Sequence, residues 1–201
     1  SAGKTRSVEI VLRSGFLSGR TRLSVVVAPF RALCHEIGLS LRQAFVDDDV
    51  KIDEFSDALQ LDFLHQIPEL VGSDYPTFNY ILVLTPEKLL YVLRNAPTLV
   101  RNIGIVVYEE GHQFDSGTRG ITYELLLTEI KALLPQGAQT VLVSAVIPNA
   151  QAIGEWLIGD EVRVVNGSSL LPTSRSVAFA SWIERRGQLM FFESGGYRRP
   201  D

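Results

Sequence analysis

Short runs of apolar, β-branched residues alternate along this chain with longer stretches in which apolar residues recur at helical spacing. This alternation constrains the fold more than any other feature, because strands that are apolar on both faces need helices on both sides of their sheet. Parallel strands also need crossover segments between them, and the helical stretches occupy those places. We therefore predict an α/β fold with strands at 23–28, 80–84, 103–108 and 140–144, a weaker strand at 162–165, and helices at 4–13, 30–44, 86–94, 123–133 and 149–157.

The chain starts with Ser1, Ala2, Gly3, Lys4 and Thr5, which match the second half of the phosphate-binding pattern G-x-x-x-x-G-K-[ST]. In such a loop Gly3 lets the backbone approach the phosphates, Lys4 reaches phosphate oxygens and Thr5 offers its hydroxyl to Mg²⁺. The same five residues also fit an ordinary helix start. This motif alone therefore leaves both interpretations open.

Polar residues directly follow four of the predicted strands. In open α/β sheets, ligands bind outside the carboxyl ends of the strands, so residues at these positions are placed for chemistry. We expect the four clusters to share one edge of the sheet with the segment 1–5. They are PFRAL at 29–33, TPEK at 85–88, EEGH at 109–112 and SAV at 144–146.

The order and spacing of these clusters resemble the first motor domain of superfamily 2 helicases, and in particular the Ski2-like branch. The resemblance extends over nearly all of residues 1 to about 180, and it includes Arg119-Gly120, Tyr123-Glu124 and the segment 144–157. It implies a RecA-like P-loop three-layer sandwich with a mainly parallel central sheet. It also implies an ATP-dependent helicase that uses ATP and Mg²⁺ and has nucleic acid, RNA or DNA, as a partner.

The resemblance assigns Lys4, Glu110 and His112 to catalysis, the loop described above to ATP, and Thr5 and Glu109 to Mg²⁺. Adjacent residues on an extended backbone point in different directions, so one carboxylate can face the metal and the other the γ-phosphate. The family has an aspartate where this chain has Glu109. Because Mg²⁺ requires near-octahedral geometry, the longer side chain leaves the activity of the ATPase open.

The same resemblance assigns nucleic-acid contacts to Arg31, to Thr85 with the helix start that contains Lys88, and to Arg119. These groups suit phosphates better than base edges, so binding is expected to be independent of sequence and sensitive to salt. Thr85 also fits as the N-cap of the helix that begins at Pro86.

Ser144 and Ala145 match the segment that couples ATP hydrolysis to strand separation in that family. Val146 stands where the family has a threonine, and its apolar side chain cannot make the hydrogen bond of the missing hydroxyl. We therefore expect the coupling to be altered while the fold tolerates the substitution.

The resemblance further implies a piece of a longer protein. Residues 1–182 correspond to the first motor domain, and 183–201 to the start of a linker toward a second RecA-like domain that supplies arginines to the reaction. The strand that precedes the phosphate-binding loop has no counterpart, so we expect either upstream residues or one of the runs 177–182 and 188–192 to fill a central slot in the sheet. On its own, the chain is expected to bind ATP weakly and to hydrolyse it negligibly.

Composition sets further limits. At 201 residues and 46% hydrophobic the chain can bury a full core, and its net charge of -4 does not by itself indicate nucleic-acid binding. Cys34 is the only cysteine, which excludes an internal disulfide, and no apolar run approaches the ~20 residues of a membrane span. We expect a cytoplasmic protein with no membrane partner. The acidic stretch at 47–57 is expected to be a solvated loop and helix face, because no metal-ligand spacing repeats in it.

Two other functions stay open at this point. A degenerate RecA-like module that binds a protein or nucleic acid without ATP turnover is favoured by Glu109 and Val146. An unrelated P-loop enzyme, such as a small-molecule kinase, is opposed by the order of the motifs.

Overall fold

A computed structural model of the chain describes residues 3–55, 78–111, 118–145, 149–159, 163–165, 177–183 and 186–192. The chain separates into two units, Ser1–Val164 and Val165–Asp201. The first unit contains every predicted site residue, and the second contains a single hairpin among its described residues.

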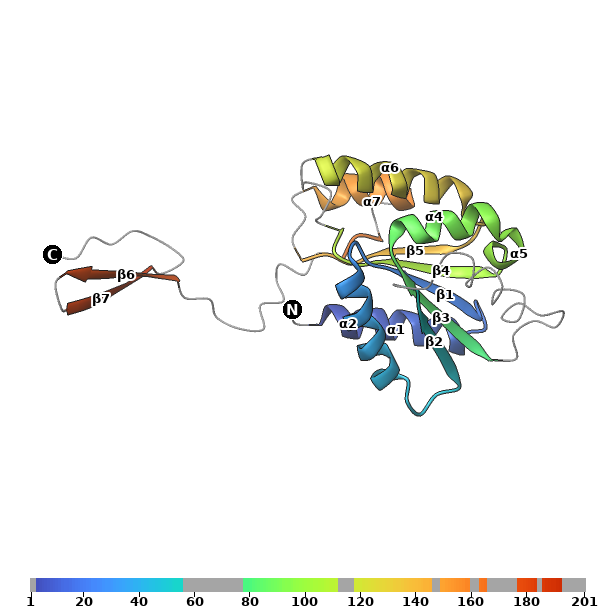
Figure 1. The fold of residues 1–201 in the computed structure, drawn as a ribbon, viewed down its shortest axis with the longest axis horizontal. Helices are drawn as coiled ribbons and strands as arrows, with labels where there is room; N and C mark the ends of the chain where they lie inside the picture. The colour runs from blue at the N-terminus through green and yellow to red at the C-terminus, as the bar shows by residue number, and fades with distance from the viewer. Residues whose placement is uncertain are drawn as a thin grey trace. The chain divides into compact units, whose positions relative to one another are not determined.

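A five-stranded parallel sheet in the order β2-β3-β1-β4-β5 forms the centre of the first unit (Figure 1). Because β1 is paired on both sides and all its residues are buried, the segment that connects α1 to α2 runs through the middle of the core. The strands are β1 (Leu23–Val27), β2 (Val50–Glu54), β3 (Asn79–Leu84), β4 (Ile103–Tyr108) and β5 (Gln139–Leu142).

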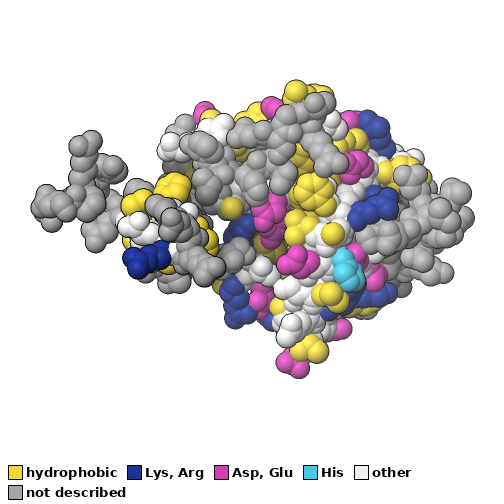
Figure 2. Space-filling model, turned by 60° about the vertical axis from the view of Figure 1, so that its left-hand side comes forward, with side chains coloured by type: hydrophobic (Ala, Val, Ile, Leu, Met, Phe, Trp, Pro, Cys, Tyr) yellow, Lys and Arg dark blue, Asp and Glu magenta, His cyan; other side chains and the backbone are white. Residues whose placement is uncertain are grey.

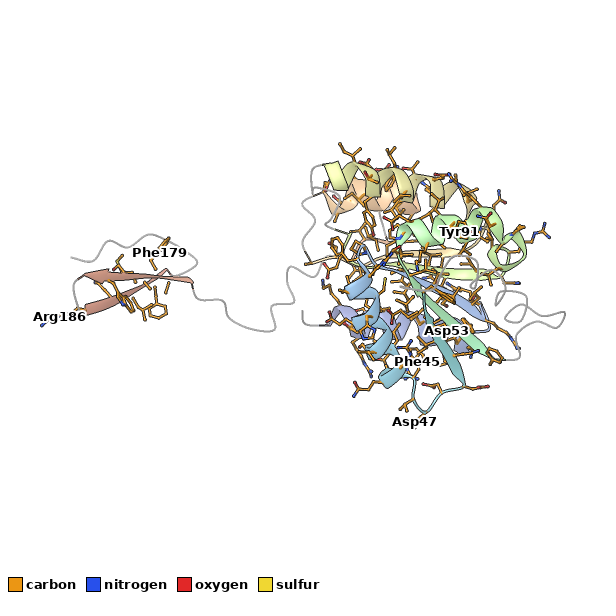
Figure 3. All side chains as sticks on the ribbon, in the orientation of Figure 1. Phe45, Asp47, Asp53, Tyr91, Phe179 and Arg186 are labelled. Atoms are coloured by element: carbon orange, nitrogen blue, oxygen red, sulfur yellow. The ribbon has the colours of Figure 1, made fainter. Side chains whose placement is uncertain are left out.

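Helices cover both faces of this sheet (Figure 1). Side chains that alternate along β1 enter two different clusters, since Val25 and Val27 pack on one face and Val26 on the other. Figure 3 shows side chains filling the space between the sheet and the helices of the first unit. Helices α1 (Lys4–Leu17) and α2 (Arg31–Ala44) lie on one face, and α4 (Pro86–Asn95), α5 (Pro97–Val100), α6 (Thr118–Leu133) and α7 (Ala150–Ile158) on the other. This is the predicted three-layer α/β arrangement.

Two predictions about strands are wrong. The acidic stretch contains strand β2, which pairs in parallel with β3 and sends Ile52 into the core. An edge strand tolerates polar residues. Asp53 and Glu54 therefore interrupt the apolar run that would have predicted β2. The predicted weak strand at 162–165 is also wrong as far as it is described, because residues 163–165 form no strand; Val162 lies outside the described residues.

The expected central slot does not occur among the five described strands, since each is hydrogen-bonded to the next in the order. The two runs proposed to fill it instead form β6 (Val177–Ile183) and β7 (Arg186–Phe192), which pair with each other in an antiparallel hairpin. Strand β5, which has β4 as its neighbour in the described sheet, is only half-buried along its length. Partial exposure of this kind is typical of a strand at a sheet edge.

Candidate functional site

The carboxyl ends of the parallel strands place the predicted residues on one edge of the sheet. Arg31 begins α2 after β1, Thr85 precedes α4 after β3, and Glu109 and Glu110 follow β4. Helix α1 runs opposite to the strands, so its first residue, Lys4, reaches the same edge. Parallel pairing therefore brings together residues that are far apart in sequence.

At this edge of the sheet, Lys4 and Glu110 form an ion pair. Lys4 Nζ lies 2.5 Å from Glu110 Oε1, across 106 residues of sequence. The two side chains are 17% and 24% exposed, so the ion pair is partly shielded from water. Gly3 precedes α1 with φ 89°, a left-handed conformation that favours glycine. These features bring the basic and acidic ends of the predicted ATP site within contact distance.

The neighbouring carboxylate, Glu109, is held more deeply. It is 6% exposed, and its backbone N–H donates to the carbonyl oxygen of Val27 on β1. Burial raises the pKa of Glu109, the charge of Lys4 lowers it, and the charge of Glu110 raises it again, with a net increase. A cation at this position would offset the desolvation of the carboxylate.

The backbone at Glu110 is not extended, which corrects the expectation for this pair. Its φ is 57°, the one left-handed value at a non-glycine residue in the described chain. The backbone therefore leaves the extended conformation at Glu110, directly after Glu109. The next residue, Gly111, donates its N–H to Val143, and a Cβ there would lie 2.8 Å from Leu142 Cδ1. Close packing under β5 thus fixes the chain directly after the turn.

Three of the predicted nucleic-acid residues, Arg31, Thr85 and Lys88, lie at the β2-β3-β1 end of the same edge. Arg31 is exposed, Lys88 is half-buried, and both make interactions within the protein. Thr85 is the N-cap residue of α4, as predicted, but its hydroxyl makes no capping hydrogen bond. Pro86 at the first helical position already lacks one N–H that would need a partner. Arg119 lies in α6, and its side chain is outside the described part.

The remaining predicted residues divide into described and undescribed positions. Ser1, Ala2, His112 and Val146 lie outside the described residues. Thr5 and Ala145 are exposed, whereas the Ser144 hydroxyl is buried without a hydrogen-bond partner among the described residues. Within the described ranges, no three His, Cys, Asp or Glu side chains form a metal-ligating group.

Sequence analysis did not identify Tyr123 as a site residue. Its ring is buried on α6, and burial together with the charges of Glu87 and Glu109 raises the pKa of its hydroxyl. Tyr123 therefore lies within electrostatic reach of both the carboxylate pair and the start of α4. The motif Tyr123-Glu124 was visible in the sequence, but its distance from the strand ends gave no signal of this proximity.

Figure 2 views the molecule from the side at which the strands end, and acidic, basic, histidine and apolar side chains all gather on that face. Within the described residues, no helix is both long enough and apolar enough to span a bilayer.

Comparisons with known proteins match this arrangement. The family model for DEAD/DEAH box helicases matches residues 1–153. The chain is 29% identical over 177 residues to the Hachiman protein HamB of Bacillus cereus, which covers 87% of the chain and 15% of that protein. It is 26% identical over 157 residues to the antiviral helicase SKI2 of Saccharomyces cerevisiae, covering 78% of the chain and 10% of the relative.

A third relative is the ATP-dependent DNA helicase Hel308 of Thermococcus kodakarensis, which is 28% identical over 198 residues, or 97% of this chain and 15% of Hel308. The chain thus spans between 10% and 15% of the length of these three relatives. The predicted family resemblance and α/β fold are confirmed. With a family model over more than three quarters of its length and with these relatives, the chain belongs to the DEAD/DEAH box helicase family, in its Ski2-like branch.

Proposed function

We propose that the chain is the first motor domain of an ATP-dependent nucleic-acid helicase, which binds Mg-ATP at the β4 end of the sheet edge and the strand backbone at the β2-β3-β1 end. The contact between Lys4 and Glu110 carries this proposal, because it joins the two predicted halves of the ATP site. The strand order supports a division of the edge into two sites, since β4 and β5 lie on one side of β1 and β2 and β3 on the other.

The residues at the β4 end fit a magnesium nucleotide. Mg²⁺ usually keeps several waters and takes one or two carboxylates together with phosphate oxygens, so it needs no cluster of three protein ligands. Thr5 and the buried Glu109 would hold it, and Gly3 and Lys4 would bind the phosphates. When bound, Mg²⁺ neutralises charge on the phosphates during transfer.

The side chains then have separate tasks. Lys4 leaves Glu110 and donates to phosphate oxygens, where its charge stabilises the charge that develops in the transition state. Glu110, released from the ammonium, accepts a proton from the attacking water. The ion pair with Lys4 holds Glu110, while Glu109 is buried next to it, so the proposed base and the proposed metal ligand have different surroundings. In the proposal, His112, Ser144 and Ala145 couple this site to strand binding.

At the other end, Arg31, Thr85, Lys88 and Arg119 would contact phosphates of a single strand. A second RecA-like domain in a longer protein would supply further arginines, which agrees with relatives several times the length of this chain. The alternative is a RecA-like module that binds nucleic acid without ATP turnover. Glu109 favours that alternative, because its longer side chain stands where the family has aspartate.

Because the chain on its own is expected to hydrolyse ATP negligibly, the test uses a longer protein that includes the second RecA-like domain. ATP turnover is measured with and without single-stranded RNA and DNA, for that protein and for its Lys4→Ala variant. We expect strand-stimulated turnover that Lys4→Ala abolishes. Lys51→Ala is the matched control, because Lys51 lies near the amino end of β2, at the opposite edge of the sheet. Turnover that neither RNA nor DNA stimulates would refute the helicase function, and strand binding without turnover would establish the alternative.

A further inference from the structure

His35 and Glu54 form a pair at the β2 end of the sheet edge that the proposed function does not use. Glu54 is the last residue of β2, and its side chain is 9% exposed. His35 lies on α2, one turn after Arg31, and its side chain is 64% exposed. The His35 Nδ1 atom is 3.1 Å from Glu54 Oε2. A buried carboxylate thus holds one side of a ring whose other side reaches solvent.

The structure makes room for this carboxylate. Gly38 lies in the interior of α2, where glycine costs about 1 kcal/mol of helix stability relative to alanine. A Cβ at this position would lie 3.3 Å from Glu54 Oε2, closer than ordinary van der Waals contact. The glycine therefore lets the Glu54 carboxylate approach the helix next to His35.

The chemistry of the pair determines which ring nitrogen is left for a ligand. An ionised carboxylate only accepts hydrogen bonds, so His35 Nδ1 must be the donor to Glu54. The opposite nitrogen, Nε2, is then an acceptor in the neutral ring and a donor in the protonated ring. A protonated ring would donate to Glu54 on one side and to an anion on the other.

We propose that His35 is a further nucleic-acid contact, which donates Nε2–H to a backbone phosphate of the bound strand, and that Glu54 is its positioning residue. The position fits, because residues four apart on a helix lie on the same face and Arg31 stands four residues before His35. This inference rests on the proposed strand-binding function.

Several charged groups surround the ring. On α2 these are Arg31 one turn before it, Glu36 next to it, and Arg42, whose Nη1 atom lies 3.5 Å from the Cβ position of Gly38. Strand β2 contributes Glu54. Of the other elements packed against α2, β3 contributes Ile81 and Val83, which do not titrate, and α1 contributes Arg13, which donates to the Ala44 carbonyl at the far end of α2.

The adjacent thiol of Cys34 does not titrate near neutral pH. Burial and the charge of Glu54 together raise its pKa to about 11. Cys34 therefore adds no charge beside His35 near neutral pH.

Fluorescence anisotropy with a labelled single-stranded oligothymidine tests the proposal, at about pH 6 and about pH 8. We expect His35→Ala to weaken binding roughly 3- to 10-fold at the lower pH and to change it little at the higher pH, because the neutral ring has no Nε2–H to donate. His35→Arg should restore binding and make it independent of pH. Glu54→Gln should reduce the pH dependence.

The control is Gln43→Ala, a change at an exposed polar residue farther along α2 that should leave binding unaltered. Arg31→Ala distinguishes failure of the proposed strand binding from failure of the His35 contact. If Arg31→Ala weakens binding and His35→Ala does not, the proposed function stands and this inference is wrong. An equal loss for His35→Ala at both pH values, without rescue by His35→Arg, would indicate a purely structural role and also overturn it. Absence of strand binding by the unaltered protein would refute the proposed function and this inference together.

Discussion

The ion pair between Lys4 and Glu110 predicts that Glu110→Gln tightens ATP binding while it slows ATP turnover. Because Lys4 Nζ lies 2.5 Å from Glu110 Oε1, the ammonium must leave the carboxylate before it reaches a phosphate oxygen. An amide carries no charge and holds the ammonium less strongly. The amide also cannot accept a proton from the attacking water, so the same substitution removes the proposed base.

The burial of the pair sets the size of the effect. Exposed ion pairs contribute about 0 to 1 kcal/mol, and removing one partner of a fully buried pair costs about 3 to 5 kcal/mol. The side chains of this pair are 17% and 24% exposed, so its contribution lies between those two values. It lies nearer to the value for exposed pairs, because both charged groups still contact water. A cost of about 1.4 kcal/mol for releasing Lys4 corresponds to a roughly tenfold change in the Kd for ATP.

Isothermal titration calorimetry with Mg-ATP measures the Kd, and phosphate release by the intact, longer protein measures turnover. The matched control is Glu124→Gln, which makes the same chemical change at an exposed glutamate on α6. We expect Glu110→Gln to bind Mg-ATP about tenfold more tightly than the unaltered protein, and the control to bind it with an unchanged Kd. A Kd for Glu110→Gln equal to or weaker than that of the unaltered protein would show that the ion pair does not compete with the nucleotide.

Three further predictions concern single carboxylates and one hydroxyl. Glu109→Asp should keep or raise ATP turnover of the intact, longer protein, measured by phosphate release, and a loss would show that the site is adapted to glutamate. Tyr108→Phe should raise the free energy of unfolding in urea by about 1 kcal/mol, because the Tyr108 hydroxyl is buried with no hydrogen-bond partner among the described residues; a decrease would reveal a partner. Burial raises the pKa of Glu9, but hydrogen bonds from Arg6 and Arg13 outweigh it and hold the pKa below its usual value of 4.5. The ionised carboxylate therefore stabilises the fold above that value and ceases to do so as the pH falls through the lowered pKa. Glu9→Gln should flatten this acid decline in melting temperature, and an unchanged decline would contradict the role of the pair.

The layered fold could be predicted from the sequence because its signals are local. Short apolar runs predict four of the strands, and apolar residues at helical spacing predict the helices between them. Strand β2 was not predicted, because at the sheet edge only Ile52 needs to be buried and polar residues can occupy the other positions. The hairpin of β6 and β7 was misassigned for a related reason. Apolar runs show that residues can pair in a sheet but not with which strand they pair.

The predicted site residues divide in the same way. Gly3, Lys4 and the carboxylates after β4 could be identified from residue type and motif order. The left-handed backbone at Glu110 could not, because it depends on how Gly111 packs against Leu142 from another strand. The contact between His35 and Glu54 could not be predicted either, because it joins a helix to a strand that was not predicted.

By itself, then, the sequence determined the α/β class, the helicase family and the types of side chain available at the strand ends, because these depend on periodicity and short motifs. Only the tertiary structure decided which of those side chains meet. The strand order places β1 between β3 and β4, which separates the proposed nucleotide end from the proposed strand-binding end, and it brings Lys4 to Glu110 across 106 residues. Such contacts follow from the pairing of whole strands, a long-range property that no local pattern encodes.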